Sequence, residues 1–381
     1  MKRQPIYLDN NATTRIDRQV AETLSHAWSQ GYVNPSSQHA LGRRSRAALE
    51  TAKEDLLKGI GAQTQGFASD ELLLTSGGTE SNNLAIFGLV KPQPGKVIVS
   101  SIEHPSVSAA ADLLRMRGYD VQAIRVQQNG LVDLDHFRQL LSPDTQLVSM
   151  MLANNETGVL QPVAEMAAMC REIEVKTHTD AVQAVGKSDV QFRELGVDAL
   201  TLTAHKMHGP RGVGGLVLRH GVQISPQLHG GGQQLAKRPG TEPVELGIAM
   251  TEALRLSLAA KADYAEIAQL RAEMEASLRE IDPTAVIHGA DVARLPHTIS
   301  VSFPGIDRQA LVMAVDLAGV CISTGSACAS GSSERSPVLI AMGLENDQIE
   351  SAVRISLGRD TTGDEAREAL SRISKCVNNL R

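Results

Sequence analysis

Short apolar runs alternate with amphipathic, helix-like stretches through the central part of the chain. The apolar runs are rich in β-branched residues and lack strict polar–apolar alternation, which is typical of strands buried on both faces of a sheet. Strands separated by helices form βαβ units, whose strands run parallel and whose crossovers are right-handed. The alternation therefore predicts an α/β fold built on a mostly parallel sheet. The expected strands are 71–74, 96–101, 121–126, 146–152, 175–179, 197–203 and 212–218, and the expected helices are 48–60, 107–117, 134–141 and 163–174.

The pattern changes after Pro243. A long helical stretch, 245–281, is followed by short strands and helices that indicate an α+β arrangement. These later elements are strand 298–303, helix 309–316 and the strand pair 320–323 and 352–356. Because 381 residues exceed the usual size of one domain, we expect two domains. A large domain spans 16–257, and a small domain combines 1–15 with 258–381, so the boundary falls inside the long helix.

Composition excludes several classes of protein. A net charge of −6 gives no support to direct nucleic-acid binding. The amino terminus lacks the apolar core of a signal peptide, and no apolar run approaches the ~20 residues that cross a bilayer. We therefore expect a soluble, cytoplasmic protein without a membrane segment. The cysteines Cys170, Cys321, Cys328 and Cys376 show neither CxxC nor His/Cys ligand spacing, so no metal site and no disulfide framework is expected.

Lys206 gives the first indication of chemistry. It follows the predicted strand 197–203, and Asp180 and Gln183 follow the strand before it. A lysine held at a strand end can form a Schiff base with an aldehyde, and an aspartate can face a pyridinium nitrogen. Pyridoxal 5'-phosphate (PLP) enzymes require both groups. Taken alone, a solvated lysine after a strand is the simpler interpretation, and the other motifs favour the cofactor.

The sequence TSGGTESNN, residues 75–83, follows a predicted strand and opens a helix. Glycines allow a close approach of the backbone to an anion, and a helix N-terminus offers free N–H groups, so phosphate is a suitable occupant. No Gly-Lys-Ser/Thr follows, which excludes a P-loop. An ordinary helix cap at Thr79 or Ser81 is the alternative.

Two further motifs also lie at strand ends, where ligands bind in open α/β sheets. His104, in the sequence SIEHPS, could stack on a flat cofactor ring and move protons, or it could be structural. Asn155, in the sequence NNETG, could bond a ring hydroxyl or a substrate carboxylate, or belong to a plain turn.

The later part of the chain adds a thiol, two arginines and a glycine-rich loop. Cys328 lies in a run of small and polar residues, which indicates an exposed loop suited to a nucleophile. Arg354 or Arg359 could bind a substrate carboxylate in a bidentate way, or form a surface ion pair. The run HGGGQQ leads to Thr241, which could reach a phosphate in its own subunit or in a dimer partner, or be part of a flexible connection.

Taken in order along the chain, these motifs resemble a cysteine desulfurase of the class V aminotransferase-fold group. The resemblance runs from YLDNNATT (7–14) through NPSSQH (34–39) to SLGR (356–359), nearly the whole chain. The sequence STGSACASG around Cys328 favours the long-loop branch that serves iron–sulfur cluster and tRNA thiolation pathways. Gly78 stands in place of the commoner alanine, and Gln234 in place of the usual glutamate. The chain ends soon after its last helix, so binding of a cluster scaffold protein is not implied.

The resemblance implies a PLP-dependent transferase fold of the aminotransferase type I kind, with a seven-stranded sheet in the large domain. It also implies a role for each candidate residue. Lys206 binds PLP covalently, Asp180 pairs with its ring nitrogen, Gln183 reaches its hydroxyl and His104 stacks on its ring. The phosphate is bound by Thr79, Thr203 and His205, with Thr241 arriving from the partner of a homodimer, and Gly78 also belongs to the cofactor site. Asn155 contacts cofactor and substrate, and Arg354 with Asn34 addresses the substrate carboxylate.

The activity implied is conversion of L-cysteine to L-alanine, with sulfur passing to Cys328 as a persulfide and then to an acceptor protein. Three alternatives stay open at this point. A selenocysteine lyase or cysteine sulfinate desulfinase would use the same cofactor site without needing Cys328. An aminotransferase would release a keto acid. A catalytically idle sulfur-relay or partner-binding protein would bind no PLP.

Overall fold

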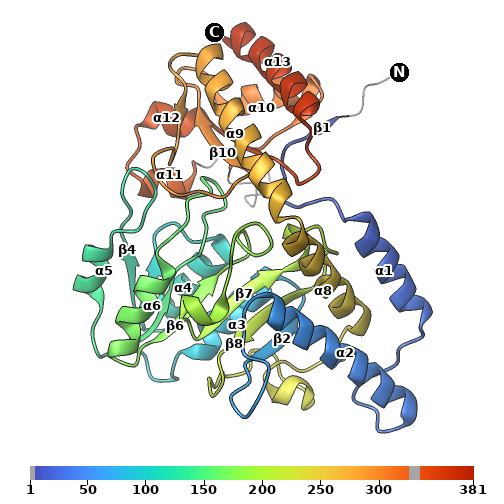
Figure 1. The fold of residues 1–381 in the computed structure, drawn as a ribbon. Helices are drawn as coiled ribbons and strands as arrows, with labels where there is room; N and C mark the ends of the chain where they lie inside the picture. Colours follow the sequence, from blue (N-terminus) through green and yellow to red (C-terminus); the bar gives the residue numbers. More distant parts are fainter. Residues whose placement is uncertain (1–4, 326–334) are drawn as a thin grey trace.

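A seven-stranded sheet forms the centre of the larger, lower part of the molecule in Figure 1. The computed structural model describes residues 5–325 and 335–381. The strand order is β2-β8-β7-β6-β5-β3-β4, and β8 is antiparallel to both neighbours while the other pairs are parallel. This confirms the predicted α/β class. The strands are β2 (Glu71–Thr75), β3 (Lys96–Ser100), β4 (Asp120–Ile124), β5 (Thr145–Ser149), β6 (Lys176–Asp180), β7 (Ala199–Thr203) and β8 (Gly214–Leu218).

Helices cover both faces of this sheet, which explains why most residues of its strands are buried. Successive side chains of a strand point to opposite faces. Leu72 and Leu74 pack in the cluster that includes α1 (Arg18–Ser29), α2 (Ala40–Gly59), α6 (Val163–Glu172) and α8 (Val244–Ala259). Leu73, between them, packs in the cluster that includes α3 (Gly78–Leu89) and α4 (Pro105–Met116). The short helices α5 (Leu134–Leu140) and α7 (Phe192–Leu195) lie in the same part of the chain.

The smaller, upper part in Figure 1 has its own sheet and its own apolar core. Strand β10 (Thr298–Ser302) lies between β12 (Ala352–Ser356) and β9 (Val286–Ile287), antiparallel to both. Strand β1 (Ile6–Tyr7) pairs in parallel with β11 (Val320–Cys321). The helices here are α9 (Lys261–Ile281), α10 (Arg308–Leu317), α11 (Pro337–Ala341), α12 (Asn346–Glu350) and α13 (Gly363–Leu380). The separate cores agree with two domains, while their bounds at 15/16 and 257/258 stay predictions.

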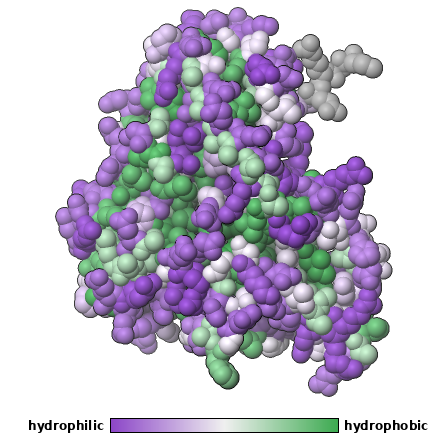
Figure 2. Space-filling view, viewed as in Figure 1, coloured by the Kyte–Doolittle hydropathy of each residue, from purple (hydrophilic) through white to green (hydrophobic). Residues whose placement is uncertain are grey.

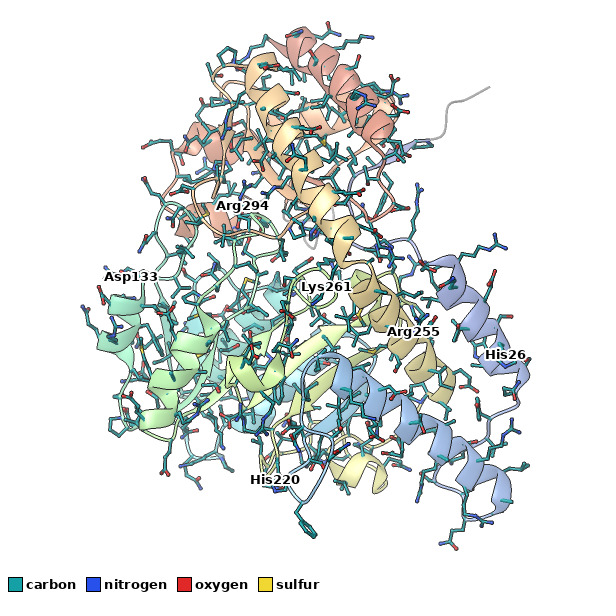
Figure 3. All side chains as sticks on the ribbon, in the orientation of Figure 1. His26, Asp133, His220, Arg255, Lys261 and Arg294 are labelled. Atoms are coloured by element: carbon teal, nitrogen blue, oxygen red, sulfur yellow. The ribbon has the colours of Figure 1, made fainter. Side chains whose placement is uncertain are left out.

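Two features differ from the sequence-based expectation. The long helix is interrupted at Ala260, between α8 and α9, and Figure 3 labels Arg255 and Lys261 on either side of the break. Helix α8 packs on α1 and α2 whereas α9 packs on α13, so the two halves of the expected helix belong to different apolar cores. The expected strand pair is joined only by the bridge between Ser323 and Arg354, because β11 pairs with β1 and β12 with β10.

Hydrophilic side chains cover most of the face seen in Figure 2. Within residues 5–325 and 335–381, none of the helices combines the length and the apolar character needed to cross a membrane. Several large apolar side chains are nevertheless exposed, among them Trp28, Leu41 and Leu235.

Gly214 sits where β8 passes the loop after β2. A Cβ atom at this position would lie 2.7 Å from the backbone Cα and C of Gly77 and 3.0 Å from the carbonyl oxygen of Leu202. Backbone atoms inside a sheet cannot move away cheaply, so this position requires glycine.

Gly214→Ala should lower the free energy of unfolding by roughly 1–3 kcal/mol, as overpacking does. Chemical denaturation measures this. The matched control is Gly363→Ala, at the start of α13, where the nearest atom is the flexible end of Arg367. That variant should be as stable as the wild type or slightly more stable. Equal stability of Gly214→Ala and wild type would contradict the close approach.

Candidate active site

A cavity of about 210 Å³ opens at the carboxyl ends of the central strands. Residues that follow β2, β3, β5, β6 and β7 line it, so segments far apart in the sequence meet there. Nine of the predicted site residues are among them: Gly78, Thr79, His104, Asn155, Asp180, Gln183, Thr203, His205 and Lys206.

Lys206 closes the 3₁₀ turn η1 (Ala204–Lys206), directly after β7. Its ammonium donates to the carbonyl oxygens of Asn11 and, at 2.9 Å, Ala12. Nδ1 of the neighbouring His205 lies 3.1 Å from the hydroxyl oxygen of Thr13. Burial, with the nearby Lys206 charge, lowers the pKa of His205 to about 4, so this imidazole is neutral near pH 7. The amino-terminal segment therefore holds the lysine at the cavity wall.

Asp180 is the last residue of β6 and is buried. Its Oδ1 accepts from the backbone N–H of Val182 at 2.9 Å, and its Oδ2 accepts from Nδ2 of Asn82 at 2.6 Å. These two donors fix the plane of the carboxylate at the cavity.

Gln183 is oriented by a lysine that the sequence analysis did not single out. Gln183 Nε2 donates to the Asn11 carbonyl at 3.1 Å, and Oε1 accepts from Nζ of Lys187 at 3.4 Å. Burial, together with the charges of Lys206 and Arg354, lowers the pKa of Lys187 to about 7. A lysine is normally exposed, and nothing in the sequence pattern showed that this one is buried.

The phosphate end of the predicted site lies at the N-terminus of α3. No side chain of the described residues caps this helix, so its first N–H groups are available to an anion. An alanine Cβ at position 78 would lie 3.0 Å from Cγ2 of Val182, so Gly78 makes room for that valine. Thr203, across the cavity, donates its hydroxyl to the Val213 carbonyl at 3.1 Å.

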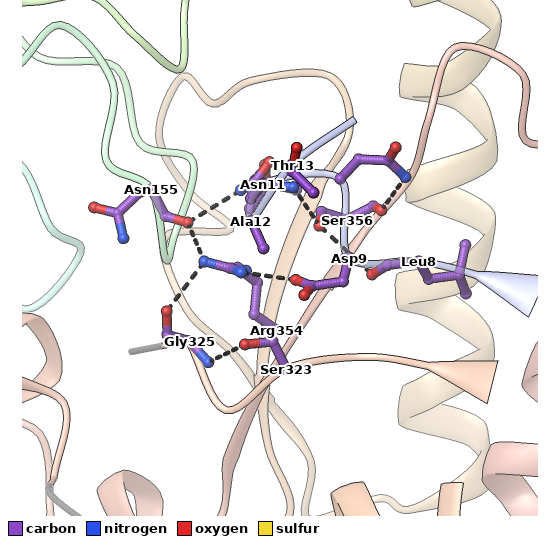
Figure 4. Close-up of polar contacts among 12 residues, drawn as sticks. Leu8, Asp9, Asn11, Ala12, Thr13, Asn155, Ser323, Gly325, Arg354 and Ser356 are labelled. Carbon is purple, nitrogen blue, oxygen red and sulfur yellow. Dashed lines mark hydrogen bonds and ion pairs between the residues drawn. The ribbon is translucent and has the colours of Figure 1, made fainter. Parts of the chain in front are cut away.

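Asn11 lies at the site but was not singled out from the sequence. It is buried, and its Nδ2 donates to Thr298 Oγ1 at 3.0 Å and to the Asn155 carbonyl at 3.1 Å. Figure 4 shows the contact between Asn11 and Asn155. Ser356 lies beside it, and its hydroxyl accepts from the Asn11 backbone N–H at 2.9 Å. Asn11 thus joins the cavity to the small sheet. Its place in the YLDNNATT motif was the only available signal.

Arg354, in β12, lies next to the cavity without lining it. Figure 4 shows its guanidinium donating to Asp9 Oδ1 at 2.8 Å and to the carbonyls of Asn155 and Gly325, both at 3.0 Å. Its Nε is buried and has no hydrogen-bond partner among the described residues. Arg359, the alternative, forms an ion pair with Asp17.

Two predicted site residues, Asn34 and Thr241, are not brought to the cavity. Asn34 is exposed, and its Oδ1 accepts from the backbone N–H of Ser36 at 2.9 Å, as in a plain turn. Thr241 is exposed and does not line the cavity within this single chain. Cys328 lies outside the described residues. Of the residues flanking that gap, Ser336 donates its hydroxyl to Glu156 Oε2 at 2.6 Å.

The residues at the cavity fit PLP. They offer an amine, a carboxylate, an imidazole and a helix N-terminus, which match an aldehyde, a ring nitrogen, an aromatic face and a phosphate. Asn82 Oδ1, at the cavity wall, is buried without a hydrogen-bond partner among the described residues. Within those residues, no three His, Cys, Asp or Glu side chains are grouped so that they could hold a metal ion.

Comparison with known proteins decides the family. The sequence model of the aminotransferase class-V family matches residues 6–368. The chain belongs to the aminotransferase class-V family. Cysteine desulfurase NifS of Azotobacter vinelandii is 38% identical over 382 residues, 99% of this chain and 93% of that protein. Cysteine desulfurase IscS of Dictyoglomus turgidum is 38% identical over 387 residues, 100% of this chain and 96% of that protein.

Solved structures agree with this assignment. A structure named NIFS-LIKE PROTEIN has a TM-score of 0.91 at 33% identity and covers 99% of this chain and 100% of its own. SspA in complex with cysteine has a TM-score of 0.80 at 30% identity and covers 92% and 98%. Class-V aminotransferases and their cysteine desulfurase members depend on PLP, so the predicted fold, family and cofactor are confirmed.

Glu103, the residue before His104, is a buried carboxyl group that the sequence analysis did not single out. Its Oε1 accepts from the Ser100 hydroxyl at 2.5 Å and from the Met151 N–H at 2.7 Å. Its Oε2 is buried without a partner among the described residues. Burial, with a smaller contribution from Asp180, raises the pKa of Glu103 from 4.5 to about 8. The folded protein therefore keeps this group protonated over a pH range in which the unfolded chain ionises it.

Glu103→Gln should change the pH dependence of stability. Between pH 4.5 and about 8 the folded state binds the extra proton, so wild-type stability falls with rising pH. Glutamine mimics the protonated acid and does not titrate. Relative to the wild type, the free energy of unfolding of the variant should rise by about 1.4 kcal/mol per pH unit across this window.

Urea unfolding at pH 5, 6, 7 and 8 measures the difference. Glu266→Gln, an exposed change on α9, should show no such trend relative to the wild type. A difference between Glu103→Gln and wild type that stays constant with pH would mean that Glu103 is ionised in the folded protein.

Proposed function

We propose that this protein is a PLP-dependent cysteine desulfurase. It converts L-cysteine to L-alanine and passes the sulfur through Cys328 to an acceptor protein. The observation that carries this proposal is the meeting of Lys206, Asp180 and His104 at one cavity, in a chain whose full-length relatives are named cysteine desulfurase.

PLP supplies, when bound, an electron sink for negative charge at the substrate α-carbon. Lys206 would bind the cofactor, and its amine would take the proton from that carbon. Asp180 accepts a hydrogen bond from the ring nitrogen, and Gln183, whose oxygen faces Lys187, directs its amide N–H groups to the ring hydroxyl and the Asn11 carbonyl. His104 packs against the ring and moves a proton at the substrate sulfur. The N–H groups at the start of α3, with Thr79, Thr203 and His205, bind the phosphate.

Cys328 takes the sulfur in this proposal. Its thiolate forms a bond to the sulfur of the substrate while the substrate carbon–sulfur bond breaks. The electron pair of that bond stays with the carbon fragment, which takes up protons and leaves as L-alanine. The persulfide on Cys328 is then the donor for an acceptor protein in iron–sulfur cluster assembly or thiolation.

Arg354 and Asn155 are the proposed contacts of the substrate carboxylate. Among the residues that the structure describes, the buried Nε of Arg354 has no hydrogen-bond partner, which supports this because a carboxylate would give it an acceptor. Asn155 lines the cavity and its carbonyl accepts from Arg354, so the two residues lie together.

A homodimer in the cytoplasm is the proposed working state. Thr241 is exposed and does not line the cavity of its own chain, which suits a residue that serves the partner's site. The exposed apolar side chains of Trp28 and Leu235 support burial against another chain.

Cys328→Ser should lower alanine and sulfide formation from L-cysteine by at least about 100-fold, the scale on which loss of a catalytic group acts. PLP binding, followed by absorbance, should be unchanged. Cys321→Ala, which removes the partly exposed thiol in β11, is the matched control and should turn over cysteine normally. Lys206→Ala should be inactive.

Each alternative function gives a different result in this assay. Equal activity of Cys328→Ser and wild type would indicate a lyase or desulfinase that does not use the thiol. Release of a keto acid would indicate an aminotransferase. Normal turnover by Lys206→Ala, or a wild type that binds no PLP, would overturn the proposal.

A further inference from the structure

Four buried or half-buried side chains form a continuous chain of hydrogen bonds between Asp180 and His104. Asp180 Oδ2 accepts from Asn82 Nδ2 at 2.6 Å, and the same Nδ2 donates to Ser106 Oγ at 2.8 Å. Ser106 Oγ lies 2.7 Å from His104 Nδ1. The chain connects β6, α3 and the start of α4, and all four residues line the cavity.

The direction of every hydrogen bond in this chain is determined. A carboxylate oxygen can only accept, so the amide of Asn82 must present its NH₂ group to Asp180. The second N–H of that group then donates to Ser106 Oγ. Ser106 Oγ accepts this bond and donates its own proton to His104 Nδ1, because that ring nitrogen is itself an acceptor.

A second contact confirms that His104 Nδ1 is an acceptor. The backbone N–H of Ser106 donates to this atom at 3.1 Å, and a backbone N–H cannot accept. A ring nitrogen that accepts carries no proton, so neutral His104 has its proton on Nε2. Ser106 therefore fixes the tautomer and the orientation of the ring through both its backbone and its hydroxyl.

The chain is shielded from water. Asn82 is 1% exposed, Asp180 5% and Ser106 8%. Asn83 Nδ2, on the next residue of α3, donates to the Ser106 carbonyl at 3.2 Å and so holds the start of α4 against α3. Hydrogen bonds in such surroundings are stronger than in water, and an unpaired member is costly.

We propose that Asn82 and Ser106 are positioning residues that couple His104 to Asp180 across the cofactor site. This inference rests on the proposed function, since it assumes that PLP binds at this cavity. It adds that the ring-facing imidazole and the ring-nitrogen partner are oriented as one unit, so loss of either linking side chain disturbs both.

The test is a set of PLP titrations on full-length apoprotein, followed by absorbance. Ser106→Ala should weaken PLP binding about 3- to 10-fold, as expected for the loss of one buried hydrogen bond. In a His104→Ala background the same change should weaken binding less than it does in the wild type, because the part of its effect that Ser106 exerts through the ring is already lost. Asn82→Ala combined with Ser106→Ala should likewise be less severe than the product of the two single effects.

Two variants control for packing. Ser101→Ala removes a buried hydroxyl that has no hydrogen-bond partner among the described residues, in the segment before His104, and should leave PLP binding within about twofold. Ser106→Thr keeps the hydroxyl and should restore most of the affinity lost in Ser106→Ala. Melting curves of all variants identify any that fail to fold.

Equal effects of Ser106→Ala in the wild-type and His104→Ala backgrounds would overturn the coupling. So would an effect of Ser101→Ala as large as that of Ser106→Ala. Cysteine turnover is measured separately, so a protein that binds PLP but does not release alanine would count against the proposed function and not against the coupling.

Discussion

Pairing of β3, β5, β6 and β7 in one direction is the constraint on which the site depends. Parallel strands end at the same edge of a sheet, so the residues after them converge even when they are far apart in sequence. His104 follows β3, Asn155 follows β5, Asp180 ends β6 and Lys206 follows β7. Burial of both sheet faces fixes the strands, and each functional side chain takes its place from the strand before it.

A buried polar junction completes the site from the other side. Asn11 contacts Asn155 from the large part and Thr298 and Ser356 from the small part, and its carbonyl accepts from Lys206 and Gln183. Buried polar groups of this kind are costly unless they are paired, so the junction forms only when both parts are in place. Asn11 therefore links folding of the small part to formation of the site.

The sequence was sufficient to identify functional residues that come directly after a predicted strand. Lys206 and Asp180 were predicted because each follows an apolar run, and the family resemblance gave them roles. Ser106, Asn82 and Lys187 were missed, because a serine or asparagine early in a helix is also an ordinary cap and a lysine is normally exposed. The break at Ala260 was missed because no Pro or Gly marks it, and it arises where one helix leaves one core for another.

The sequence by itself determined the α/β class, the order of the strands along the chain and the chemical types of the groups at their ends. Local periodicity is sufficient for these, because a strand buried on both faces lacks the polar–apolar alternation of a half-exposed strand. Only the tertiary structure decided which groups share a hydrogen bond. The link from Asp180 through Asn82 and Ser106 to His104 joins three elements over 98 positions of sequence separation. Such contacts depend on distances of a few ångströms between packed surfaces, which local sequence patterns do not specify.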